Sequence, residues 1–157
     1  MLDSLLIPFR GQPQPPQLPP GYSLELELDP PPEELNALLV ACGEPKRSPD
    51  RLRRALERSD WCLSIRNTAG QLVGFARVTT DQALNANIWD LVAHPVDPSA
   101  AALLLVLVYT LQSRLRREMP GCGMSLAASP MALAALHQHG FVVDPGGIRA
   151  MGLRLQA

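Results

Sequence analysis

Apolar and polar residues alternate, or apolar residues run together, over several short stretches of the chain, and these patterns predict strands. Four such stretches lie in the first two thirds of the sequence: residues 22–28, 61–66, 71–79 and 87–93. Three shorter stretches follow near the C-terminus: residues 124–127, 141–143 and 150–155. A turn over residues 67–70 joins the second and third strands into a hairpin.

Between these strands, apolar residues recur at spacings of three and four, which predicts helices. The expected helices cover residues 33–42, 49–58, 98–118 and 130–139. Ser48–Pro49 and Asp97–Pro98 each place a capping side chain before a proline at the first helical position. Gly43 and Gly140 are expected to end the first and the last helix.

The order of these elements predicts an α+β domain over residues 21–157, with one mixed sheet and helices packed on it. Residues 1–20 are rich in proline and glutamine. We expect them to form an extended N-terminal tail, because proline fixes φ and removes a backbone donor. An alternative stays open: the apolar residues 5–9 would allow this tail to fold onto a partner.

The composition narrows the classes of protein to which this chain can belong. The chain has 157 residues, of which 46% are hydrophobic and 18% charged, which is enough apolar surface for one buried core. Its formal net charge of −1 argues against a strongly basic nucleic-acid binder. The longest apolar run, residues 100–108, is far shorter than the about 20 residues that span a bilayer. We therefore expect a cytoplasmic protein that neither inserts into membranes nor binds nucleic acid.

The cysteines and histidines do not show the spacing that is typical of a metal site or of a disulfide framework. The cysteines are widely spaced and fit reduced thiols in a cytosol: Cys42, Cys62 and Cys122. The histidines stand at no metal-ligand spacing with them: His94, His137 and His139. We expect no metal site.

The longest predicted helix is apolar on every face over residues 100–111 (AAALLLVLVYTL). One face can pack on the sheet. The opposite face must be exposed, or covered by another chain or by the proline-rich tail. This pattern favours an interaction protein with a protein partner or a homodimer.

Basic residues gather around the second predicted helix: Lys46, Arg47, Arg51, Arg53, Arg54 and Arg58. Arg51, Arg54 and Arg58 share one helix face by their spacing. One interpretation is a docking patch for an acidic protein surface or for nucleotide phosphates. The other, which we favour at this point, is a solvated face partly neutralised by Asp50 and Glu57.

Three separated segments resemble one protein family in order and spacing: residues 47–59 (RSPDRLRRALERS), 70–95 (GQLVGFARVTTDQALNANIWDLVAHP) and 139–153 (HGFVVDPGGIRAMGL). They are similar to the second helix, the central strands and the C-terminal end of GNAT N-acetyltransferases. The branch they resemble is cyanobacterial and plastid and includes the plant chloroplast serotonin and lysine N-acetyltransferases. The resemblance runs from about Leu24 to Leu155. It implies the acyl-CoA N-acyltransferase fold, with a mixed sheet of about six to seven strands and helices on both faces.

The resemblance also implies acetyl-CoA as cofactor, with its pyrophosphate cradled by backbone N–H groups where the fourth strand leads into the long helix. The family motif there, Arg/Gln-x-x-Gly-x-Gly/Ala, maps onto residues 98–103 (PSAAAL). Pro98, Ala101 and Leu103 stand at its defining positions, so we interpret the motif as eroded. Asp97 would in addition turn its carboxylate onto the amides that a pyrophosphate needs.

If the cofactor bound, the resemblance would place it on the backbone of one strand and one helix start: Leu91, Val92, Ala93, Ser99, Ala100, Ala101 and Ala102. The tyrosine that the family commonly uses as general acid maps onto Leu136, which has no proton to donate. His137 and His139 are offset along that helix and are expected to point elsewhere.

Asp90 and Trp89 lie on the strand that lines the acceptor side in GNAT proteins. Asp90 is the one candidate for a catalytic base toward an amine. The interpretation favoured here is an ordinary strand carboxylate that holds the loop at Thr80 and Asp81; burial together with a perturbed pKa would favour the base. We expect Trp89 to belong to the core.

These patterns favour a GNAT-fold protein with a degenerate active site, a non-catalytic or weakly active accessory or regulatory protein that acts through protein–protein contacts. The alternative is an active acetyl-CoA-dependent N-acetyltransferase of a protein lysine, an N-terminus or an arylalkylamine such as serotonin. The resemblance alone implies the second hypothesis, whereas Pro98, Leu103, Leu136 and the all-apolar helix favour the first.

Overall fold

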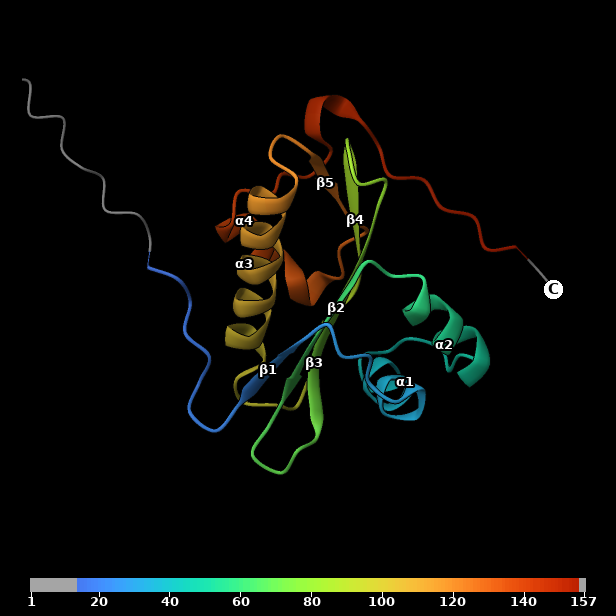
Figure 1. Ribbon diagram of the computed structural model, residues 1–157, viewed down its shortest axis with the longest axis vertical. Helices are drawn as coiled ribbons and strands as arrows, with labels where there is room; N and C mark the ends of the chain where they lie inside the picture. The colour runs from blue at the N-terminus through green and yellow to red at the C-terminus, as the bar shows by residue number, and fades with distance from the viewer. Residues whose placement is uncertain (1–13, 156–157) are drawn as a thin grey trace, which may run out of the picture.

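A single five-stranded sheet organises the chain, which the computed structural model describes over residues 14–155. The strands lie side by side in sequence order: β1 (Ser23–Leu26), β2 (Trp61–Arg66), β3 (Leu72–Thr80), β4 (Asn85–Ala93) and β5 (Gly123–Ser125). Strands β1 to β4 pair with one another in antiparallel fashion, whereas β5 runs parallel to β4. The sheet is therefore mixed, as expected (Figure 1).

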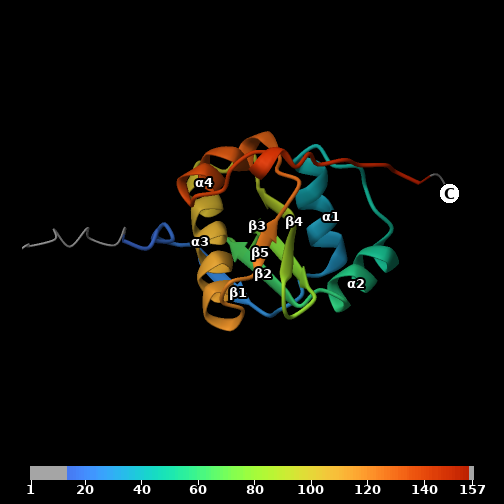
Figure 2. The ribbon, with the colours of Figure 1, turned by 90° about the horizontal axis from the view of Figure 1, so that it is seen from above.

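Helices cover both faces of this sheet: α1 (Pro32–Ala41), α2 (Pro49–Glu57), α3 (Ala100–Glu118) and α4 (Leu133–Gln138). Figure 2 shows α3 and α4 on one side of the strands and α1 and α2 on the other. Short 3₁₀ turns occupy Pro130–Ala132 and Pro145–Gly147. This arrangement confirms the predicted α+β fold with helices on both faces.

Each face of the sheet has its own core because successive strand residues point to opposite sides. On the α3 side, Leu63 and Ile65 of β2 pack with α3 residues such as Leu107. On the α1 side, the fully buried Phe75 packs with Leu35 of α1. Packing on both faces fixes the shape of the central strands. Truncating a buried phenylalanine such as Phe75 to alanine typically costs about 3–5 kcal/mol of unfolding free energy.

Helix α3 is covered within its own chain. Its inner face is buried against the sheet through Leu103, Leu107 and Leu111. Residues 14–22 run along the helix in Figure 1, and Leu18 packs against the same core. Of the coverings expected from the sequence, the proline-rich segment is thus observed over residues 14–20, while residues 1–13 of the predicted tail lie outside the described residues.

The two strands expected at 141–143 and 150–155 are not formed within the described residues, so the prediction of six to seven strands was too high. Apolar alternation gives a strand only where a paired edge exists, and β5 offers an edge of only three residues. The chain instead turns at Pro145–Gly147 and continues in irregular form. Apolar side chains of this segment stay exposed, above all Met151, Leu153 and Leu155.

None of the helices described has the length and apolar character needed to cross a membrane. All three cysteines are free thiols. Over residues 14–155, no group of histidine, cysteine or acidic side chains could hold a metal ion.

Candidate functional site

β4 changes character halfway along its length. Its first part, Asn85–Asn87, pairs with β5. From Ile88 to Ala93 it has no strand partner on that side among residues 14–155. This stretch, called the open edge of β4 below, leaves backbone groups free to bind an extended ligand chain, because a strand edge offers unpaired N–H and C=O groups.

A β-bulge interrupts the open edge of β4 at Asp90. The register between β3 and β4 shifts between Phe75 and Arg77, so that one β3 residue faces Asp90 and Leu91 together. Asp90 has a φ of 53°, which is uncommon for a residue that carries a Cβ. Such a conformation persists where the surroundings over-determine it, and it often marks a functional position.

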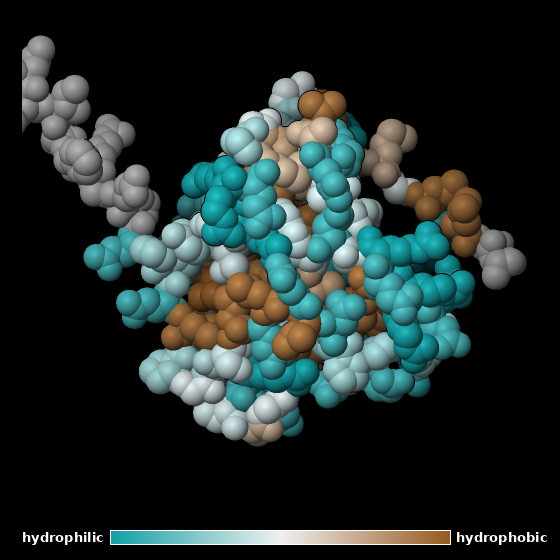
Figure 3. All heavy atoms as spheres, in the orientation of Figure 1, coloured by the Kyte–Doolittle hydropathy of each residue, from teal (hydrophilic) through white to brown (hydrophobic). Residues whose placement is uncertain are grey.

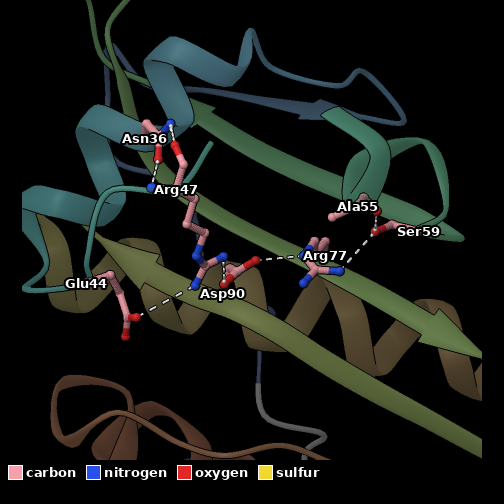
Figure 4. Close-up of polar contacts among 7 residues, drawn as sticks. All are labelled: Asn36, Glu44, Arg47, Ala55, Ser59, Arg77 and Asp90. Carbon is pink, nitrogen blue, oxygen red and sulfur yellow. Dashed lines mark hydrogen bonds and ion pairs between the residues drawn. The ribbon is translucent and has the colours of Figure 1, made fainter. Parts of the chain in front are cut away.

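Two arginines hold the Asp90 carboxylate, whose side chain is only 9% exposed. Arg47 donates from Nη1 to Oδ1 at 2.9 Å, and Arg77 donates from Nε to Oδ2 at 2.7 Å (Figure 4). Both oxygens therefore already accept charge-assisted hydrogen bonds. The prediction that Asp90 holds the loop at Thr80 and Asp81 was wrong. Its partners lie 43 and 13 positions away along the chain, which local patterning cannot reveal.

Asn36 of α1 fixes Arg47 in place. Asn36 is buried, and its side-chain amide donates to the Arg47 carbonyl at 2.8 Å. Its Oδ1 accepts from the Arg47 backbone N–H at 3.0 Å, and the guanidinium also lies 3.7 Å from Glu44 (Figure 4). This clamp anchors the loop between α1 and α2 above Asp90. The spacing of these residues in the sequence does not predict this clamp.

Trp89 lies at the surface beside this network, not in the core as expected. The residue is 44% exposed, and its Nε1 donates to Thr79 Oγ1 at 2.8 Å. The Arg77 guanidinium carbon stands 5.6 Å from the ring centroid, within cation–π range. The reason for its exposure is that α1 packs further along the strands, beside Phe75 and Val92, and leaves this end of the sheet face uncovered.

The side chains of Leu91, Val92 and Ala93 are buried in the two cores, so these residues can offer a ligand only their backbone. The Cys42 thiol donates to the Ala93 carbonyl oxygen at 3.4 Å. Burial raises the pKa of Cys42, and the Glu44 carboxylate raises it further. The last carbonyl of the open edge of β4 is therefore capped by a neutral thiol.

The chain from His94 to Ala102, called the α3 entry below, already holds an anionic group. Asp97 Oδ1 accepts from the Ser99 N–H at 2.8 Å and from the Tyr22 hydroxyl at 2.8 Å. α3 begins at Ala100, so the expectation that Asp97 caps the helix needs correction: its carboxylate closes the turn just before it. Pro98 has no N–H to offer.

Free donors do remain at the α3 entry. The Ala100 amide donates to the Asp97 carbonyl at 3.1 Å, whereas the amides of Ala101 and Ala102 donate to no acceptor within residues 14–155. The predicted cofactor residues thus divide into Ser99 and Ala100, whose amides are engaged, and two alanines whose amides are free. Two free amides behind a carboxylate form a poor cradle for a pyrophosphate.

The residues expected around a general acid do not form one. Leu136 is buried in the α3-side core. His139 Nδ1 lies 2.8 Å from the Ala135 carbonyl and His137 Nδ1 lies 3.2 Å from the Phe141 carbonyl, so both rings engage their own helix and its end. The structure therefore brings together Asp90, Arg47 and Arg77 but assembles no proton donor from α4.

Comparison with known proteins places this geometry in context. No family model matches the chain. "Serotonin N-acetyltransferase 2, chloroplastic" of Oryza sativa is 38% identical over 123 residues, which cover 74% of this chain and 59% of the rice protein. "Uncharacterized N-acetyltransferase ycf52" of Porphyra purpurea is 34% identical over 121 residues, 75% of this chain and 68% of that protein. The chain therefore spans somewhat more than half of the rice relative's length.

Solved structures agree in fold. A probable acetyltransferase from meticillin-resistant Staphylococcus aureus superposes with a TM-score of 0.73 at 17% identity, covering 85% of this chain and all of that one. A GNAT-family N-acetyltransferase from Escherichia coli in complex with CoA gives a TM-score of 0.55 at 14% identity, covering 80% of this chain and 71% of that one. At these identities the likeness concerns the fold alone.

Proposed function

The chain belongs to the GNAT N-acetyltransferase family, and within that family we propose that it is a non-catalytic or weakly active accessory protein that acts through protein–protein contacts. The α3 entry carries this proposal. A GNAT protein holds the pyrophosphate of acetyl-CoA at the start of this helix, and here a resident carboxylate, Asp97, lies on the turn before it.

Repulsion between negative charges is the physical reason why the α3 entry should bind a pyrophosphate poorly. The Asp97 carboxylate is fixed by Tyr22 and Ser99, so it repels a second anion that approaches the amides of Ala101 and Ala102. Pro98 removes one further donor from the same turn. These residues do not fit a pyrophosphate, although the open edge of β4 fits an extended amide chain.

The proton-transfer groups support the same proposal. Leu136 stands where the family commonly has its tyrosine, and it is buried among apolar side chains. Asp90, the one candidate for a base, has both oxygens engaged by arginines. A proton taken from an amine would remove the negative charge that Arg47 and Arg77 share, so both ion pairs oppose this role.

Isothermal titration calorimetry with acetyl-CoA and with CoA tests the proposal on the full chain. We expect no heat of binding at ligand concentrations up to about 1 mM, which corresponds to a binding free energy weaker than about −4 kcal/mol. The double variant Asp97→Asn, Pro98→Gln removes the carboxylate charge and restores a backbone donor. We expect it to bind at least about tenfold more tightly than the natural chain, since each tenfold step is about 1.4 kcal/mol.

Glu33→Gln serves as the matched control, because it removes an exposed carboxylate from the first turn of α1 and should leave CoA binding unchanged. Circular dichroism melts establish that each variant is folded. Micromolar binding of acetyl-CoA by the natural chain, together with acetyl transfer to an amine, would overturn the proposal.

A second candidate function is supported by the open edge of β4 and its bulge, which leave strand backbone free beside the acceptor side. This candidate is an active acetyl-CoA-dependent N-acetyltransferase. The printed name of the rice relative suggests serotonin as an acceptor, and a protein lysine or N-terminus is the other acceptor class. We place either activity in the cytoplasm, where the three free thiols would stay reduced.

A further inference from the structure

We propose that one face of α2 binds an acidic segment of a partner protein. This surface, called the basic face of α2, consists of cations from three parts of the chain: Lys46, Arg51, Arg54, Arg58 and Arg154. Figure 3 shows hydrophilic side chains gathered over α2. The inference rests on the proposed function in one respect, because it names the chemistry of the partner through which the protein would act.

The basic face of α2 is not neutralised by its own helix. Asp50 pairs with Arg53 at 2.8 Å, and Arg53 is not part of that face. Glu57 forms no ion pair within the described residues, and none of the five cations of the face lies within 4.0 Å of a described carboxylate. Of the cluster identified in the sequence, Arg53 is thus neutralised by Asp50, whereas Arg51, Arg54 and Arg58 pair with neither Asp50 nor Glu57 in the part of the chain that the structure describes.

A cavity of about 450 Å³ lies beside this surface. It is bounded by the loop between α1 and α2, by α2 itself and by the C-terminal segment. Lys46, Arg51 and Arg154 line it together with the apolar Leu52 and Ala55. Cations around an apolar floor suit a peptide that presents carboxylates with an apolar side chain between them.

Carboxylates fit these cations better than nucleic-acid phosphates do. Arginine's planar fork binds a carboxylate through two parallel hydrogen bonds. Arg51 to Arg58 spans about 10 Å of helix, which is short for a nucleic-acid track. Among residues 14–155, the cavity lining includes no aromatic side chain on which a base could stack. The whole chain carries a formal charge of −1, without the broad positive field of a nucleic-acid binder.

Binding here would also reach the candidate site. Arg47 lines the same cavity, while its guanidinium holds Asp90 on the open edge of β4. An acidic side chain entering the cavity competes with Asp90 for Arg47. Partner binding should therefore change the surroundings of the bulge, and the neighbouring Trp89, a residue that is 44% exposed, reports this through its fluorescence.

The test is fluorescence anisotropy of a short labelled peptide, rich in glutamate with leucines between, titrated with the full chain at low and physiological salt. We expect binding that weakens as salt rises, since the contacts are exposed charge pairs. The triple variant Arg51→Gln, Arg54→Gln, Arg58→Gln should weaken binding by about tenfold or more. The matched control Arg53→Gln, Arg116→Gln, Arg117→Gln removes the same charge elsewhere and should change it less than about twofold.

Two competitors decide the class of partner: a single-stranded oligonucleotide and vesicles with anionic lipids. If either binds the natural chain more tightly than the peptide at the same salt, and loses that binding in the triple variant, an acidic protein segment is the wrong partner. Equal peptide binding by the triple and control variants would also overturn the inference. Acetyl-CoA titration of the same samples tests the proposed function separately, because loss of peptide binding and gain of cofactor binding are independent readouts.

Discussion

The open edge of β4 and the α3 entry meet at His94, yet they are built in different ways. The open edge of β4 is shaped by two packed cores and by a partly buried ion-pair network around Asp90. The α3 entry is a half-buried turn closed by one carboxylate and one tyrosine hydroxyl. The open edge of β4 is thus held by packing on both faces of the sheet, whereas the α3 entry is held by hydrogen bonds to one carboxylate. The two regions can be separated experimentally.

Replacing Asp90 should have the largest effect. Asp90→Ala leaves two guanidinium groups without their shared carboxylate, one of them 14% exposed. We expect the free energy of unfolding to fall by about 3 kcal/mol, since removing one partner of a buried charge pair strands the other. Urea denaturation at neutral pH measures this.

Asp50→Ala is the control for Asp90→Ala, because Asp50 forms an exposed pair with Arg53. Its effect should stay within about 0.5 kcal/mol. Equal losses in the two variants would mean that the open edge of β4 is no more firmly held than an ordinary surface pair.

Asn36→Ala comes next. It removes both hydrogen bonds to the backbone of Arg47 and leaves a buried void. We expect a loss of about 2 kcal/mol in unfolding free energy, together with a change in Trp89 fluorescence. Asn87→Ala, on an exposed asparagine of β4, should cost much less. If Asn36→Ala leaves the unfolding free energy and the Trp89 fluorescence unchanged, the loop between α1 and α2 is held by its ion pairs alone.

Some features of the fold and of the candidate site could be predicted from the sequence, and others could not. Strand β2 is found at the predicted residues 61–66, and α3 ends at Glu118 as expected, because local periodicity and proline–glycine punctuation suffice there. The Asp90 network could not be predicted, because its contacts depend on the packing of α1 against β4. The C-terminal strands were predicted wrongly for the converse reason: their pattern is local, but no strand of the described part of the chain pairs with them.

Tyr22→Phe tests the α3 entry and should cost about 1 kcal/mol, the worth of one hydrogen bond to a carboxylate that stays solvated. A double-mutant cycle with Asp97→Asn measures the pair directly. If the cycle gives no coupling, the carboxylate is free to move, and the electrostatic argument against a bound pyrophosphate weakens.

A third carboxylate gives the smallest and most specific effect. Backbone N–H groups of Asn85, Ala83 and Leu84 lower the pKa of the exposed Asp81 to about 2, from an ordinary 3.8. Because the folded state has the lower pKa, this contribution is present above about pH 4 and is lost as the pH falls toward about 2.

Asp81→Asn should therefore flatten the loss of stability between about pH 4 and pH 2, measured by urea denaturation at each pH. Glu33→Gln provides the comparison, as an exposed carboxylate at the start of α1. The same acid loss in the natural chain and in Asp81→Asn would contradict the assignment of these hydrogen bonds.

The Tyr22–Asp97 hydrogen bond has a consequence for the order in which the molecule can assemble. It joins residues 75 positions apart, and β1 itself pairs with β2 some 40 positions later, Leu24 opposite Ile65. During synthesis the first strand therefore leaves the ribosome long before anything it binds has been made. β1 can pair once β2 has been made, but the Tyr22 hydroxyl finds its acceptor only when the chain has grown past Asp97, so the contacts of residues 22–26 are completed late.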